Sequence, residues 1–266
     1  MRVLYVTQEM DPYTSLTEIS QIFKSIPKYV HEKGFELRVL MPKYGVINER
    51  RHRLHEVVRL SGMNIIVDDE DYPLIIKVAS IPQARLQVYF LDNEEFFKRK
   101  NLFVDDDGKP FEDNVERMVF FSKGVMEIVR KFGWAPDIVH CHGPITGLIP
   151  LFVKRLYRND PIFSDTKVIY SAYTDIISSS FDNRFWEIAA INNLDVGDIK
   201  VYGEEDIIDI NSGAMKYSDG IIIANNNESE KAEMIAREMN IPVLPFTEDE
   251  EHLAGIVSFY KENFAV

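Results

Sequence analysis

The sequence predicts an α/β fold with a single, doubly wound, mostly parallel sheet of the Rossmann-like kind, carrying a β-hairpin insertion. Short apolar runs of strand length alternate with segments whose apolar residues recur at helical spacing, which is typical of a parallel sheet covered on both faces. The chain has 266 residues, of which 45% are hydrophobic and 12% aromatic, enough for a substantial core. We therefore expect residues 1–266 to form one domain.

The first elements form a βαβ unit. Val3–Val6 is a short apolar run that predicts a buried first strand, and Leu37–Met41 predicts the second. Between them, apolar residues at helical spacing from Leu16 to Val30 predict a helix. Thr17 is a candidate N-cap for this helix, and Gly34 is expected to end it.

A β-rich insertion follows at about residues 54–85. Short apolar runs at Val57–Leu60, Asn64–Val67 and Leu74–Val78 predict strands, separated by turns at Ser61–Gly62, at Asp68–Asp71 and near Pro82. A core strand at Val88–Leu91 closes the insertion.

The rest of the chain alternates regularly. Helices are predicted at Val115–Phe132, Leu148–Tyr157, Ile207–Tyr217 and Glu228–Met239, with an extra C-terminal helix at about 248–264; strands are predicted at Asp137–Cys141, Lys167–Ala172, Gly220–Ala224 and Val243–Phe246. Residues 181–203 are expected to be irregular.

The net charge excludes two classes of partner, and the cysteine content excludes an intrachain disulfide. The net charge is −13 and the pI is about 5.0, so the surface should repel nucleic acid and anionic membranes. The one cysteine, Cys141, excludes an intrachain disulfide and fits a reducing compartment. No signal-peptide pattern or membrane span is recognised, and we expect a cytoplasmic location.

Ligands of doubly wound sheets usually bind beyond the carboxyl ends of the strands, where the strand order changes direction. In this sequence that rim comprises Thr7–Thr17, His142–Thr146, Tyr173–Ser178 and Asn225–Glu228.

Several motifs occur together along this framework. They are Glu9-Met10-Asp11-Pro12-Tyr13, Pro27-Lys28, Arg38 to Gly45, Phe90 to Phe97, Asp105-x-Asp107-Gly108, Asp113-Asn114-x-Glu116-Arg117, Gly133-Trp134-x-Pro136 to His142, and Thr146-Gly147-Leu148-Ile149-Pro150. In this order and spacing, from residue 1 to about 225, the chain resembles the N-terminal catalytic domain of the glycogen and starch synthases. The resemblance implies a GT-B glycosyltransferase domain from enzymes that move glucose from ADP- or UDP-glucose to an α-glucan.

The loop after the first strand departs from the family pattern. The family carries Lys-x-Gly-Gly-Leu there, and the matching residues are Ser15 to Ile19, with Ser15 at the lysine and Thr17 and Glu18 at the glycines. A lysine supplies positive charge to a diphosphate, and glycines let backbone N–H groups approach it. Serine supplies no charge, and the carboxylate of Glu18 repels a diphosphate.

Further departures follow at the same rim. Gly143, Pro144 and Ile145 replace the Asp, Trp and His of the family, Tyr173-Thr174 replaces its His-Asn pair, and Asn225 replaces a proline. We also expect no second domain before the chain ends at Val266, so half of the family's cleft would be missing. The seven candidate ligand-facing residues are Ser15, Thr17, Glu18, His142, Thr146, Tyr173 and Asp175. No catalytic residue, metal ligand or cofactor is predicted.

Three functions follow from this pattern. The first is a pseudoenzyme, incompetent for glucosyl transfer alone, that acts as a binding or regulatory module through the exposed cleft face, with a protein partner or its own copy. The second is a glucosyltransferase completed by a partner chain. The third is a sugar or nucleotide binder at the strand-end crevice, which includes a nucleotide sugar as ligand.

Other residues suggest chemistry that their context does not support. His140 and His142 share one strand face, but two imidazoles are too few for a metal site, and a hydrogen-bonded strand end explains them. Cys141 faces the opposite side and is expected in the core. The Asp105–Gly108 segment lacks EF-hand spacing and is read as a solvated turn.

One aromatic cluster could serve either binding or core packing. Phe181, Phe185 and Trp186 lie together in the irregular segment. If exposed, they form a platform for a sugar or a protein contact; if buried, they are packing.

Overall fold

The structure is a computed structural model that describes residues 1–81, 86–191, 194–204 and 206–265. Its centre is a ten-stranded sheet in the order β12-β11-β8-β7-β1-β2-β6-β5-β3, with β4 paired to β5. The parallel strands are β1 (Arg2–Thr7), β2 (Glu36–Pro42), β6 (Gln87–Asp92), β7 (Ile138–His142), β8 (Lys167–Ala172), β11 (Gly220–Ile223) and β12 (Val243–Leu244). This confirms the predicted mostly parallel α/β sheet.

The antiparallel edge carries the hairpin insertion. It consists of β3 (His55–Glu56), β4 (Met63–Val67) and β5 (Glu70–Ser80), and β5 runs antiparallel to β6. The predicted strand at 57–60 is wrong, because these residues form a turn in which Leu60 N donates to Val57 O at 2.9 Å. The predicted turn at Pro82 lies outside the described residues.

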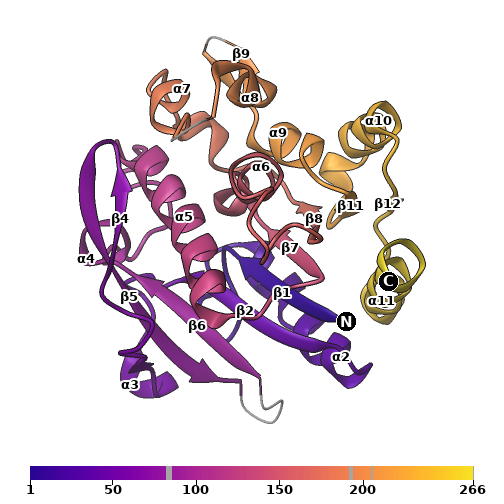
Figure 1. The fold of residues 1–266 in the computed structure, drawn as a ribbon, viewed down its shortest axis with the longest axis horizontal. Coiled ribbons are helices and arrows are strands. Elements are labelled where there is room, and N and C mark those ends of the chain that lie inside the picture. The colour runs from indigo at the N-terminus through magenta and orange to yellow at the C-terminus, as the bar shows by residue number, and fades with distance from the viewer. Residues whose placement is uncertain (82–85, 192–193, 205, 266) are drawn as a thin grey trace.

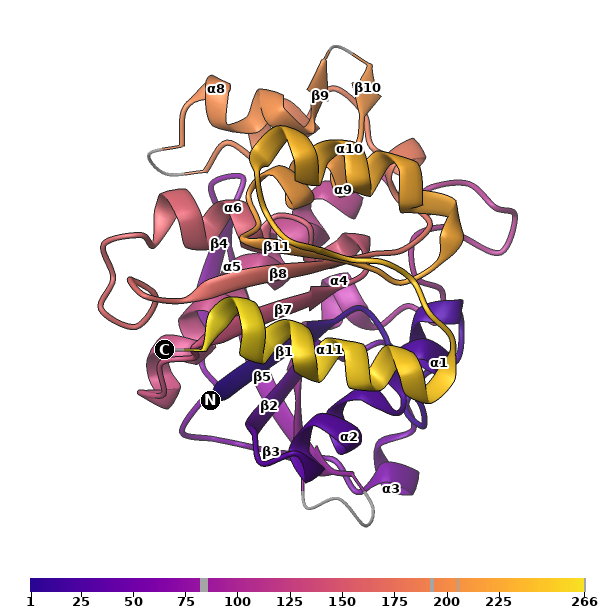
Figure 2. The ribbon, with the colours of Figure 1, turned by 90° about the vertical axis from the view of Figure 1, so that its right-hand side faces the viewer.

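Helices cover both faces of the sheet (Figures 1 and 2). On one side lie α5 (Asn114–Phe132), α6 (Ile149–Leu151), α9 (Ile210–Lys216) and α10 (Ser229–Met239), and on the other α1 (Glu18–Phe23), α2 (Ile26–Glu32) and α11 (Asp249–Phe264). Short helices α3 (Glu49–His52), α4 (Glu94–Phe97), α7 (Phe185–Ile188) and α8 (Val196–Ile199) and the pair β9 (Gly203–Glu204) and β10 (Ile207–Ile208) occupy the connections.

Three helix predictions need correction in detail. The helix predicted at Ile207–Tyr217 begins only at Ile210, because Ile207–Ile208 form β10 and pair with β9. The helix expected from Leu16 to Val30 is divided into α1 and α2, with Pro27 near the start of the second helix, where its missing N–H costs no helical hydrogen bond. The segment expected to be helical at 148–157 contains only three α-helical residues, followed by a π-helical turn at Phe152–Leu156. Gly34 does end α2, with a φ of +89°.

The strand order changes direction between β1 and β7. From β1 the chain adds β2 and β6 on one side, and from β7 it adds β8, β11 and β12 on the other. Thr7 pairs with His142 at this point, so the loops that follow these two strands start side by side. The loops after β1 and β7, which belong to the expected ligand-binding rim, therefore lie next to each other in the fold.

Candidate functional site

The loop after β1 is organised around one buried carboxylate. Glu9 is fully buried, and its Oε1 accepts a hydrogen bond from Leu16 N at 2.9 Å. Its Oε2 accepts from Thr17 N at 2.8 Å and from Thr17 Oγ1 at 2.5 Å. These N–H groups belong to the segment from which the family resemblance implies a phosphate cradle, and here an internal anion engages them.

The predicted helix cap is corrected by the same contacts. Thr17 does stand at the N-cap position of α1, but its side chain makes no capping hydrogen bond because its hydroxyl donates to Glu9. Ser15 is exposed, and its hydroxyl accepts from Gln21 Nε2 at 3.3 Å.

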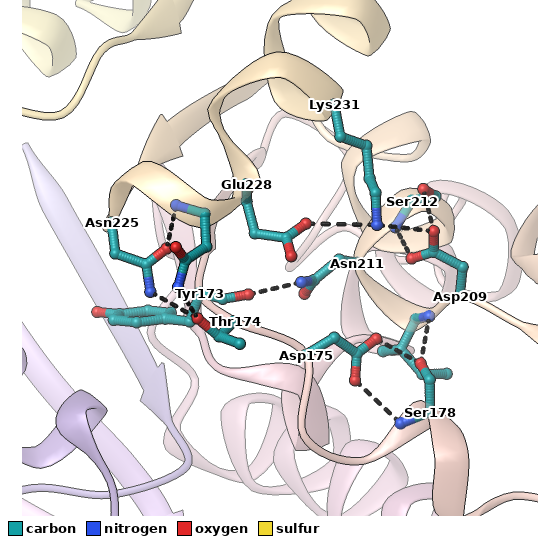
Figure 3. A network of polar contacts seen from close by, with 12 residues as sticks. Tyr173, Thr174, Asp175, Ser178, Asp209, Asn211, Ser212, Asn225, Glu228 and Lys231 are labelled. Atoms are coloured by element: carbon teal, nitrogen blue, oxygen red, sulfur yellow. Dashed lines mark hydrogen bonds and ion pairs between the residues drawn. The ribbon is translucent and has the colours of Figure 1, made fainter.

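Amide side chains connect the start of α1 to the loops after β8 and β11. Figure 3 shows the contact of Asn225 with Thr174, which joins the latter two loops. Asn225 Nδ2 donates to Glu18 Oε1 at 2.5 Å and to Thr174 Oγ1 at 3.0 Å. Asn227 Nδ2 donates to the same threonine oxygen at 3.0 Å. Three loops far apart in the sequence are thereby joined at one edge of the sheet.

A second part of this network surrounds Lys231. Its ammonium lies 3.0 Å from Asp209 Oδ2 and 3.4 Å from Glu228 Oε2 (Figure 3). Burial raises the pKa of Glu228, and Lys231 opposes that rise. Burial also favours the neutral form of Asp209, but hydrogen bonds from Ser212 and Lys231 outweigh it and lower the pKa of that carboxyl. Lys231 is therefore held by two carboxylates of this chain.

The side chain of Asp175 accepts hydrogen bonds from the turn that follows it. Its Oδ1 accepts from Ile177 N at 3.0 Å and from Ser178 N at 2.9 Å, and its Oδ2 accepts from the Ser178 hydroxyl. That hydroxyl oxygen also accepts from Ile210 N at 3.0 Å, at the start of α9. The predicted site residue thus fixes the loop after β8 to the next helix.

His142, Thr146 and Tyr173 are fully buried beneath the rim. His142 Nδ1 lies 2.9 Å from Tyr173 Oη, and Thr146 Oγ1 donates to Gly143 O at 2.7 Å. Tyr173 also belongs to a small buried apolar cluster with Ile19 and Ala224. The structure brings Glu18 close to the loop after β8 but places these three candidates inside the protein; their role toward a ligand stays a prediction.

Gly143 shows how closely the loops pack. Its φ is +89°, and a Cβ built there would lie 2.7 Å from Ile19 Cδ1 and 2.9 Å from Gln8 Cβ. A side chain at this position, such as the aspartate of the family pattern, would collide with α1.

The two strand-end histidines lie in a fully buried polar cluster. His140 Nδ1 is 2.5 Å from Tyr260 Oη, and its Nε2 is 2.7 Å from Ser171 Oγ. Tyr260 Oη also lies 3.1 Å from Tyr5 Oη. Burial holds the pKa of both His140 and His142 well below the ordinary histidine value.

The described residues contain no group of three or more His, Cys, Asp or Glu side chains arranged to hold a metal ion. The Asp105 side chain accepts from Asp107 N and Lys109 N, as in an ordinary turn. Cys141 is buried, and burial raises the pKa of its thiol. Among the described helices, none is long and apolar enough to cross a membrane.

Sequence reasoning missed the anchoring roles of Glu9, Asp209 and Lys231. Asp209 caps α9 by accepting from Ser212 N at 2.9 Å, and an aspartate directly before the helical apolar residues is an N-cap signal that predicts this cap. The contacts of Glu9 and Lys231 have no comparable local signal.

The fold defines the class of protein. The structure is similar to the catalytic domain of starch synthase IV from Arabidopsis thaliana, which was solved bound to ADP and acarbose. The TM-score is 0.71 at 18% sequence identity, and the match covers 91% of this chain and 51% of that one. The fold is therefore that of a GT-B domain, as the resemblance implied.

The sequence gives the family. Residues 2–236 match the starch synthase catalytic domain, and the chain belongs to that family. Glycogen synthases from Chlorobium limicola and Chlorobaculum tepidum are 41% and 42% identical over 173 and 187 residues. These matches cover 65% and 70% of this chain, but only 35% and 38% of the relatives. The chain thus spans little more than a third of the curated relatives it matches.

Proposed function

We propose that this domain is a starch/glycogen synthase-like binding or regulatory module that does not transfer glucose by itself. The contacts of Glu9 carry the proposal. Its buried carboxylate occupies the N–H groups of Leu16 and Thr17, which in the family pattern belong to the diphosphate loop. A nucleotide-sugar diphosphate at this loop would meet negative charge and find these donors already engaged.

The charges around the loop support the same proposal. Glu18 lies at a family glycine position and accepts from Asn225, and Lys231 is paired with Asp209 and Glu228. Lys24, the C-cap residue of α1, is paired with Asp11 at 3.1 Å. Each of these nearby lysines therefore already has a carboxylate partner.

The test is release of ADP or UDP from ADP-glucose or UDP-glucose, with glycogen as acceptor and the purified 266-residue chain as catalyst. We expect no release above the buffer rate. The variant S15K/T17G/E18G restores the family's lysine and glycines, and we expect it to bind ADP more tightly than the wild type in calorimetry. Turnover by the wild-type chain alone would refute the proposal.

A second candidate is a glucosyltransferase completed by another chain. The match of residues 2–236 to the starch synthase catalytic domain supports it, because that match is to a catalytic domain. The same assay, repeated with candidate partner chains, separates the two functions. Turnover only in the mixture would establish the second candidate.

The partner surface belongs to the same proposal. Leu16 and Ile176 are large apolar residues on rim loops, and they are 45% and 41% exposed. We propose that the cleft face contacts a protein partner or a second copy of the chain. Light scattering tests self-association directly, and a monomer at every concentration would exclude the second copy.

A further inference from the structure

A hollow with a volume of about 720 Å³ opens at the end of the molecule where α7, α8 and β9 gather beyond α9 (Figure 1). Apart from Gly203, its lining consists of the apolar side chains of Trp186, Val196 and Ile199 and the polar side chains of Asn183, Lys200, Glu204 and Asp206. None of these residues belongs to the polar network labelled in Figure 3. The hollow is therefore a surface distinct from the strand-end rim.

Two strongly exposed apolar side chains border this hollow. Val58, Ile207 and Val196 are the most exposed large apolar residues in the described part of the chain, at 78%, 75% and 63%. Val196 lines the hollow itself. Ile207 lies directly opposite the lining residue Glu204 in the β9–β10 pair, and directly paired residues project from the same face of a hairpin. Two such residues at the mouth of one hollow indicate a contact surface.

The floor of the hollow is held in place by packing. Ile199 is buried, and Trp186 is partly buried and packs edge-on against the buried Phe185, with ring centroids 5.3 Å apart. Phe185 in turn stacks on Phe181 at 5.5 Å. In this aromatic cluster Phe185 is therefore a packing residue, whereas Trp186 also lines the hollow. Side chains that are already fixed lose little conformational freedom when a partner covers them.

The charged residues of the hollow divide into one that is engaged and two that are not. Asp206 Oδ1 accepts a hydrogen bond from Asn183 Nδ2 at 2.8 Å. Lys200 and Glu204 are exposed, and within the described ranges neither side chain makes a hydrogen bond or an ion pair. The hollow therefore offers an ammonium group and a carboxylate to a partner.

A patch that carries both charges is complementary to itself. In a two-fold symmetric dimer, every contact between two different residues is made twice, once in each direction. Lys200 of each copy then meets Glu204 of the other, and the protruding Ile207 of each copy enters the hollow of the other. A partner with charge of one sign would satisfy only one of the two residues. The net charge of −13 repels two copies at long range, but salt at about 0.15 M screens this repulsion beyond roughly 8 Å.

We propose that a second copy of the chain docks on this hollow and forms a two-fold symmetric dimer. Burial of Trp186, Val196 and Ile207 supplies the affinity, and the reciprocal pairs of Lys200 with Glu204 set the register of the two copies. This face is separate from the cleft face, and the dimer does not depend on whether the chain transfers glucose.

Sedimentation equilibrium of the full chain from about 1 to 500 µM tests the proposal. We expect the wild type to pass from monomer to dimer across this range. I207D places a carboxylate in the apolar contact, so we expect it to raise the dissociation constant about tenfold or more. V58D is the matched control, because Val58 is equally exposed but lies outside the lining of the hollow, and it should dimerise as the wild type does.

Charge reversal tests the two-fold symmetry. K200E and E204K each place like charges opposite one another, and we expect each to raise the dissociation constant about fivefold. The double variant K200E/E204K restores opposite charges across the axis and should return the dissociation constant to within about twofold of the wild type. Both side chains are exposed, so these variants should fold normally. A monomer at every concentration would overturn the proposal, and so would a dimer insensitive to I207D or a double variant no tighter than the single ones.

The variant L16D/I176D separates this dimer from self-association through the cleft face. Leu16 and Ile176 are exposed on rim loops, outside the hollow, and we expect their replacement to leave the dimer unchanged. Loss of the dimer in L16D/I176D but not in I207D would place the contact at the cleft face and overturn the proposal. Glucosyl transfer, assayed on the same preparation, tests the proposed function independently.

Discussion

The loops that follow β1 and β8 and the hollow beside α7 and α8 differ in how their polar side chains are used. In the loops, Glu9 and Asp175 accept hydrogen bonds from their own segments, and Ile19 clusters with Tyr173 and Ala224. In the hollow, which has a volume of about 720 Å³, Asn183 donates to Asp206, and Lys200 and Glu204 complete the polar lining. Groups that are satisfied internally have little left to offer a ligand, so the loops contribute stability, whereas Lys200 and Glu204 border open space.

The largest expected effect concerns pH and the two buried histidines of β7. His140 and His142 stay neutral when folded, because burial holds their pKa values well below normal, whereas the unfolded chain binds protons at about pH 6.5. The unfolded state therefore gains protons as the pH falls, and stability is lost below pH 6.5. We expect the free energy of unfolding, measured in urea, to fall by about 4 kcal/mol between pH 7.5 and 5.

The H142Q variant isolates the histidine contribution. Burial raises the pKa of Glu116 and Glu228, and both carboxyls affect the wild type and the variant alike. Burial also lowers the pKa of His252, on α11, which acts in the same direction in both proteins. Between pH 7.5 and 5, the free energy of unfolding of H142Q should therefore fall by about 2 kcal/mol less than that of the wild type, which is half of the fall assigned to His140 and His142 together. Parallel curves would contradict the assignment of this effect to His142.

The next effect concerns the hydroxyl that joins α11 to the sheet. Tyr260 Oη lies within hydrogen-bonding distance of both His140 and Tyr5, so Y260F leaves two buried polar groups short of a partner. We expect a loss of about 2 kcal/mol in the free energy of unfolding in urea. Y44F is the matched control, because the Tyr44 hydroxyl is buried without a partner among the described residues, and its removal should cost almost nothing. Equal losses in both variants would contradict the network.

A smaller effect is expected at Glu9. E9Q keeps the shape of the side chain but removes the charge that strengthens hydrogen bonds from Leu16 N, Thr17 N and Thr17 Oγ1. We expect destabilisation of about 1.5 kcal/mol in thermal or urea unfolding. E32Q, on the exposed end of α2, provides a surface control. A more stable E9Q would mean that the buried carboxylate is a cost to folding, and would weaken the view that this loop is organised internally.

The smallest expected effect is at Asn225. N225A removes the donor to Glu18 and Thr174 at a solvent-accessible site, so we expect only about 0.5 kcal/mol of destabilisation. Hydrogen exchange of residues 13–18 should nevertheless accelerate, because the loop loses its link to the neighbouring loops. N226A, at the adjacent exposed position, should leave this exchange unchanged. Unchanged exchange in N225A would show that the three loops are not coupled.

The sequence allowed most of the scaffold to be predicted because its signals are local. The strands at 3–6 and 37–41 and the helix at 115–132 follow from apolar periodicity, and the structure extends them by only one or two residues. The predictions fail in segments whose conformation is set by contacts with distant parts of the chain. Residues 57–60 are apolar enough for a strand, but they turn after Val57 N has donated to Ile76 O.

The candidate site was predictable only in part. Substitutions at Ser15, Thr17 and Glu18 are visible by comparison with the family motif. The hydrogen bonds of Glu9 are made within one loop, but they depend on how that loop folds back on itself. Lys231 and Asp209 meet through the packing of α10 on α9, which no local pattern encodes.

The hydrogen bond between Tyr5 and Tyr260 joins residues 255 positions apart. A chain made from its N-terminus produces β1 well before α11, so Tyr5 cannot meet its partner until the 255 residues that follow it have been made. Until then Tyr5 and His140 lack the hydroxyl that joins them. The central strands therefore stay uncovered at this position during synthesis until α11 packs against them.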